Sequence, residues 1–120
     1  AAASFLSIID GWLKSSSFHE QRLGLRALLP LIKDNSFDNL PVLFRLLNPL
    51  VRVAPSMIRP DLLLVTESIA KRSPKECAYF LRQNMISPDT AWITRQILAS
   101  FPAEIQKGLR EAIKDPNLQI

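Results

Sequence analysis

Apolar residues recur along the chain at intervals of three and four positions, which is the spacing that places them on one face of an α-helix. No stretch alternates apolar and polar residues strictly enough to predict a β-strand. The pattern therefore predicts an all-α fold of about seven antiparallel helices, near residues 4–15, 18–33, 39–52, 57–71, 74–84, 88–99 and 102–114.

Serine-led start signals separate several of these segments. Ser17–Glu20 and Ser73–Glu76 place a Ser three residues before a Glu, which is the pattern of a capping box at a helix N-terminus. Ser87–Asp89 combines a Ser with Pro at the first helical position, where the missing N–H costs nothing. Pro30 and Pro49 fall inside two segments, and we expect each to kink or end its helix.

The spacing of the start signals indicates a repeat. Counted from Ser17, Ser36, Ser56 and Ser73, helix pairs recur about every 37–39 residues, which is in the range of HEAT-type two-helix repeats. Such repeats stack into a solenoid with a concave face. We favour a HEAT-like α-solenoid formed by residues 1–120 as a single domain, with a compact helical bundle as the alternative. The first residue is Ala, which allows the chain to be the C-terminal part of a longer protein.

Composition narrows the possible functions. The chain has 120 residues, 48% of them hydrophobic, but only 3 Gly, 1 Cys and 1 His. These counts exclude a Gly-rich phosphate loop, an internal disulfide and an ordinary structural zinc site. No apolar run approaches the roughly 18 residues that a membrane span needs. We therefore expect an intracellular protein, cytoplasmic or nuclear, with no metal and no small-molecule cofactor.

Positive charge is concentrated in the middle of the chain. The sequence has 15 Lys and Arg against 11 Asp and Glu, a net charge of +4, and the whole excess lies between residues 45 and 82. A basic centre favours an acidic partner such as nucleic acid. The alternative is a solvated surface on which arginine stems cover apolar area.

A family resemblance begins near the N-terminus. Trp12–Ser15, followed by Gln21 and Arg22, resembles a motif of the DNA alkylation repair (AlkD-type) family, whose HEAT-like members carry a Trp, a nearby Ser and then paired arginines. Arg22 stands where the family has its second arginine, and Gln21 replaces the first. The similarity spans roughly residues 5–100.

The resemblance continues through residues 57–71, where Arg59 and Lys71 match the family pattern and Leu64 stands where the family has Trp; Arg95 matches farther on. The resemblance implies a solenoid whose concave face is positively charged and binds duplex DNA. Some members of the family remove alkylated bases. The family's Trp-Asp motif, whose carboxylate assists bond cleavage, would lie before residue 1. For this chain alone we expect no turnover and no catalytic residue.

Other side chains suggest chemistry less strongly. Cys77 and His19 could form a nucleophile–base pair only if the fold brought them together, and a buried Cys77 and an exposed His19 are the ordinary interpretation. Trp12 and Trp92 could stack on bases, although core packing is the more common role of tryptophan.

Two main functional hypotheses follow. The first is a domain that binds the duplex DNA backbone electrostatically, with little sequence preference; its phosphate-contacting residues would be Arg22, Arg45, Arg52, Arg59 and Arg95. The second is a non-catalytic protein–protein interaction scaffold with no role in nucleic-acid binding. A third is a glycosylase acting on alkylated purines, with its carboxylate upstream of this chain.

Overall fold

The computed structural model describes residues 2–114, and within this range all regular secondary structure is helical. The predicted fold class is confirmed, and each predicted segment coincides with one α-helix to within about two residues at either end. The seven helices are α1 (Ala2–Leu13), α2 (Phe18–Lys33), α3 (Leu40–Val53), α4 (Arg59–Arg72), α5 (Pro74–Gln83), α6 (Pro88–Ile97) and α7 (Ala103–Ile113). Short 3₁₀ turns at Ser56–Ile58 and Leu98–Ser100 precede α4 and follow α6.

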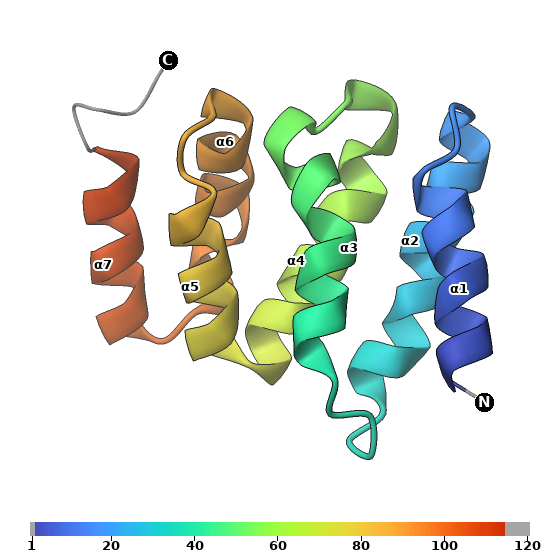
Figure 1. Ribbon diagram of the computed structural model, residues 1–120. Helices are drawn as coiled ribbons and strands as arrows, with labels where there is room; N and C mark the ends of the chain where they lie inside the picture. Colours follow the sequence, from blue (N-terminus) through green and yellow to red (C-terminus); the bar gives the residue numbers. More distant parts are fainter. Residues whose placement is uncertain (1, 115–120) are drawn as a thin grey trace.

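The helices form two layers (Figure 1). The odd-numbered helices α1, α3, α5 and α7 make one layer, the even-numbered helices α2, α4 and α6 make the other, and consecutive helices run in opposite directions. Helices α1 and α7 lie at the two ends of this stack, which measures 42 × 31 × 19 Å. The arrangement is a solenoid-like stack rather than a bundle around one central axis.

Two of the three serine start signals make the expected N-cap hydrogen bond, although the Glu20 carboxylate accepts from the Ser15 hydroxyl and not from the Ser17 amide. The Ser17 hydroxyl accepts a hydrogen bond from the amide of Glu20, and the Ser87 hydroxyl accepts one from the amide of Asp89. Ser73 departs from the capping box, because its hydroxyl donates to the Glu76 carboxylate instead of accepting from a backbone amide. In each of these places the serine still lies immediately before a helix.

Neither internal proline ends its helix. Helix α2 continues past Pro30 to Lys33, and α3 continues past Pro49 to Val53. Both prolines are exposed, so the backbone carbonyls that lose a helical partner are on the side where water can reach them.

The core lies between the two layers. Fully buried side chains come from all seven helices and include Ile9, Leu25, Leu28, Leu43, Leu47, Leu62, Ile69, Leu81, Ile93 and Leu109. In the even-numbered layer α2 packs along α4, and α4 packs along α6. In the odd-numbered layer, grooves open between α1 and α3 and between α3 and α5.

Candidate functional site

The five arginines predicted to contact DNA are divided between the two layers. Arg45 and Arg52 lie on α3 in the odd-numbered layer, and both line the groove beside α5. Arg22, Arg59 and Arg95 lie on α2, α4 and α6 in the even-numbered layer. The fold therefore separates these residues into two sets, one in each layer, and only Arg45 and Arg52 line the same groove.

Arg22 is held by a buried carboxylate. Its Nε donates to Asp61 on α4 at 2.7 Å, and the Nε of Arg26 donates to the other oxygen of Asp61, also at 2.7 Å. Asp61 is only 2% exposed, whereas the two arginine side chains are 47% and 60% exposed. Burial acts to raise the pKa of Asp61, but the hydrogen bonds and charges of the two guanidinium groups outweigh it and lower the pKa below its usual value.

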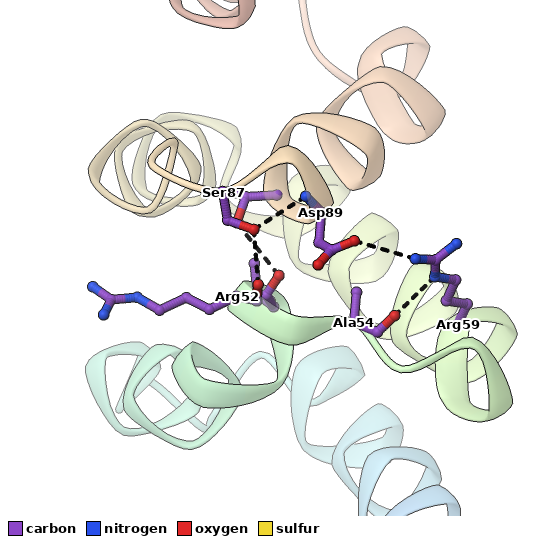
Figure 2. Close-up of polar contacts among 7 residues, drawn as sticks. Arg52, Ala54, Arg59, Ser87 and Asp89 are labelled. Carbon is purple, nitrogen blue, oxygen red and sulfur yellow. Dashed lines mark hydrogen bonds and ion pairs between the residues drawn. The ribbon is translucent and has the colours of Figure 1, made fainter. Parts of the chain in front are cut away.

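Arg59 is the most constrained of the five. Its Nε donates to the carbonyl of Ala54 at 2.8 Å, and its Nη2 lies 3.2 Å from Oδ1 of Asp89 (Figure 2). The guanidinium carbon also lies 4.6 Å from the centre of the Trp92 ring, which is the geometry of a cation–π contact. Ala54 has a positive φ of 41°, so Arg59 stabilises a left-handed turn at the end of α3. Through these contacts Arg59 links the α3–α4 turn to the start of α6.

Arg52 faces the opposite direction. Its backbone carbonyl accepts a hydrogen bond of 2.8 Å from the Ser87 hydroxyl, while its side chain points away from Arg59 (Figure 2). The Nε of Arg52 donates to Oδ1 of Asn84 at 2.8 Å. Asn84 is buried and donates in turn to the carbonyl of Phe80, so the amide is fixed and directs Arg52 along the α3–α5 groove. The terminal nitrogens of Arg52 make no hydrogen bond to any other described residue.

Arg45 and Arg95 are the least engaged of the predicted arginines. Both are exposed, and neither forms an ion pair or a side-chain hydrogen bond within residues 2–114. Arg45 stands between two grooves, one shared with α1 and one shared with α5. Asp10 lines the groove on the α1 side but is paired with Lys14 at 3.0 Å. Arg45 is therefore available to an external anion.

Sequence reasoning missed the role of Arg72. Its guanidinium donates to three carbonyls at the end of α2, those of Leu31, Ile32 and Asp34, at 3.0–3.2 Å, and also to the carbonyl of Phe37. The residue fixes the C-terminus of α2 and the loop that follows it. Because these carbonyls lie about 40 positions earlier in the chain, no local pattern signals the contact.

An apolar groove lies between α3 and α5. This α3–α5 groove has a volume of about 440 Å³ at its apolar end, which is lined by Leu40, Pro41, Phe44, Lys75, Glu76, Tyr79, Phe80 and Gln83. Phe44 and Phe80 stack with ring centres 4.9 Å apart, and Tyr79 is 58% exposed at the rim. Helical spacing identified both helices, but not that their exposed faces lie opposite each other.

The groove continues into a basic end. A second hollow of about 430 Å³ shares Phe44, Phe80 and Gln83 with the first and adds Arg45, Asn48, Arg52 and Asn84. From Leu40 to Arg52 the groove follows α3 for about 18 Å, since an α-helix rises by roughly 1.5 Å per residue. Its apolar end carries one acid, Glu76, which Ser73 holds by a hydrogen bond, and its other end carries two arginines and no acid.

The candidate nucleophile Cys77 and the candidate base His19 lie in different environments. Cys77 is buried, burial raises the pKa of its thiol to about 12, and its Sγ contacts the carbonyl of Thr66. His19 is exposed on the first turn of α2, as expected. Trp12 and Trp92 are half-buried. Within the described part of the chain, no group of three or more His, Cys, Asp or Glu side chains is placed to hold a metal ion.

The fold and the groove together define an all-α, solenoid-like domain with an open groove that is apolar at one end and basic at the other. None of the described helices combines the length and the apolar character needed to cross a membrane. Comparisons of the chain with protein-family models, with curated proteins and with solved structures found no match.

Proposed function

We propose that this domain is a helical scaffold that binds another protein through the α3–α5 groove. One observation carries the proposal. Between two neighbouring helices lies an open apolar groove, with the half-buried Phe44 and the buried Phe80 stacked at its base and Tyr79 exposed at its rim. A tyrosine at the rim of a concave apolar surface is typical of a protein-binding hot spot.

The engagement of the arginines supports this choice over phosphate binding. Arg22 and Arg59 each hold a carboxylate of this chain, and Arg59 also holds a backbone carbonyl and an aromatic ring. A phosphate group would have to displace these contacts or share them, which reduces the gain from binding. The apolar side chains of Leu40, Pro41 and Phe44, which line the groove, have no polar contact to displace.

The proposal is tested by substituting the groove rim in the purified domain. Tyr79→Glu places a charge on the apolar end of the groove, and Leu64→Glu is the matched control, because Leu64 is 44% exposed on α4 of the other layer. In nuclease-treated extracts we expect the wild type and Leu64→Glu to retain one stoichiometric protein partner that Tyr79→Glu loses. Crosslinks from that partner should map to α3 and α5. Retention by all three proteins, or crosslinks only to the even-numbered layer, would contradict the proposal.

A second function, binding of duplex DNA, is favoured by one feature of the even-numbered layer. Arg22 and Arg26 share a single carboxylate and remain half-exposed, and Arg95 has no partner among the described residues. This group carries net positive charge, and Arg22 and Arg95 stand at positions where the sequence resembles the DNA alkylation repair family. The interaction would be electrostatic, through backbone phosphates.

Fluorescence anisotropy with a labelled duplex across a salt series tests the DNA proposal. If it is correct, affinity falls steeply with salt, and Arg26→Ala and Arg95→Ala each weaken binding similarly for unrelated sequences. Arg82→Ala, at an exposed position on α5 in the other layer, serves as the control. Absence of binding at low salt would rule this function out.

A further inference from the structure

The α3–α5 groove is chemically divided along its length, and this division defines the partner more narrowly. Its apolar half lies beside the N-terminal turns of α3 and α5. Its basic half extends from Arg45, in the middle of α3, to Arg52 in the last turn of that helix. Both helices run in the same direction in Figure 1, so the polarity of the groove is the same on both walls.

We propose that the groove recognises an amphipathic helical segment of a partner protein, with apolar side chains at one end and carboxylates at the other. The proposal rests on the proposed scaffold function and specifies its ligand. Apolar anchors would pack against Phe44 and Tyr79, and acidic side chains would meet Arg45 and Arg52.

A helix fits the groove better than an extended strand. The walls are two α-helices whose backbone groups are already hydrogen-bonded within each helix, so no free sheet edge is available for strand addition. A length of about 18 Å accommodates roughly three helical turns, which display apolar side chains at i, i+3 or i+4, and i+7 on one face.

Acidic side chains are expected because the basic end has unused donors. The Nε of Arg52 is committed to Asn84, and this bond orients the side chain while the two terminal nitrogens make no bond to any described residue. Arg45 has no partner within residues 2–114. Arginine forks bind carboxylates through paired N–H donors, so two arginines seven positions apart on α3 form a receptor for two or more acids.

The other charged side chains that line the groove do not neutralise the positive charge of Arg45 and Arg52. Lys75 and Glu76 lie together at the apolar end, where their charges oppose each other. The hydrogen bond from Ser73 lowers the pKa of Glu76, so this acid is ionised at neutral pH. An acidic segment would therefore place its carboxylates at the Arg45–Arg52 end, which fixes its direction in the groove.

A phage-displayed library of helix-forming peptides about 16 residues long is the probe. Selection against the wild-type domain, with Tyr79→Glu as the counter-selection, isolates peptides that occupy the groove. We expect the selected sequences to combine apolar residues at helical spacing with Asp or Glu near one end. Fluorescence anisotropy with the selected peptides then measures affinity.

Charge reversal at the basic end gives the quantitative test. Arg45→Glu should raise the Kd of the selected peptides by about tenfold, with a weaker salt dependence than the wild type shows. Arg95→Glu, a reversal at an exposed arginine in the other layer, should leave the Kd unchanged. Because Arg45 has no intramolecular partner in the described chain, its substitution is not expected to disturb folding, and thermal unfolding followed by circular dichroism verifies this.

The outcomes separate the two proposals. Peptides that depend on Tyr79 but show no acidic enrichment, and whose Kd is unchanged in Arg45→Glu, would overturn the acidic-helix proposal and leave the scaffold function standing. Failure to isolate any peptide that Tyr79→Glu rejects would overturn both. Peptides that are enriched in acids and weakened by Arg45→Glu support both.

Discussion

Arg22 on α2 and Asp61 on α4 form an Nε–Oδ2 hydrogen bond of 2.7 Å across the even-numbered layer. The carboxylate is buried, and its second oxygen is bound by Arg26, one helical turn after Arg22. A buried carboxylate with two exposed guanidinium groups over it ties adjacent helices of the stack together. This relationship makes the predicted DNA-contacting Arg22 part of the structural framework.

Replacing Asp61 should weaken the interaction between α2 and α4. Asp61→Asn removes the charge while retaining the size, and we expect it to lower the free energy of unfolding by about 2 kcal/mol, because two guanidinium groups lose a charged acceptor. Asp10→Asn breaks the exposed pair with Lys14 and should cost less than about 0.5 kcal/mol. Urea denaturation measures both changes, and equal effects would contradict the structural role of Asp61.

Asp61 should also contribute to acid sensitivity. Its pKa in the folded protein is lowered below the ordinary value of 3.8, so its contribution is fully present above that value and is lost as the pH falls through the lower folded pKa. Urea midpoints at pH 7 and at about pH 3 should therefore differ more for the wild type than for Asp61→Asn. Parallel pH profiles for the two proteins would refute this assignment.

Arg72 should be among the most important polar residues for stability. Arg72→Ala leaves the carbonyls at the end of α2 without their donor, and we expect a loss of about 2–3 kcal/mol in the free energy of unfolding. Arg72→Lys should recover only part of this, because an ammonium group lacks the planar fork. Arg95→Ala, at an exposed surface position, is the control and should be nearly neutral. Chemical denaturation of the three variants provides the comparison.

Two helical glycines should respond oppositely to the same substitution. A Cβ at Gly11 would meet no other atom within 4 Å, so Gly11→Ala should stabilise the domain by up to about 1 kcal/mol. A Cβ at Gly24 would lie 2.9–3.2 Å from atoms of Leu13 and Trp12, so Gly24→Ala should destabilise it by about 1–2 kcal/mol despite the same gain in helix propensity. Thermal unfolding distinguishes the signs, and a stabilising Gly24→Ala would show that α1 and α2 pack less closely than described.

The Cys77 thiol should be unreactive toward thiol reagents in the folded protein. With the thiol buried and its pKa at about 12, the reactive thiolate is a minute fraction at pH 8. We expect labelling by a disulfide reagent at pH 8 to be at least about a hundredfold slower in the folded protein than in guanidinium chloride. Rapid labelling under native conditions would mean that α5 opens readily from α4.

The sequence by itself determined the helices and much of the core. Apolar residues at three- and four-residue intervals set the extents of all seven, and serines before prolines or acids marked several starts. These signals act within one or two turns, where backbone hydrogen bonding and the burial of one helical face depend on near neighbours. The burial of Cys77 was predictable because free cysteine is commonly a buried, small apolar residue.

The tertiary structure alone decided which charged residues are free and where a ligand could bind. Asp61 lies 39 positions from Arg22, and Asn84 lies 32 positions from Arg52, so neither pairing has a local signature. The groove arises because the stacking sets the rotation and separation of α3 and α5. Helical periodicity gives the face of each helix, but the neighbour that the face meets depends on packing over the whole chain.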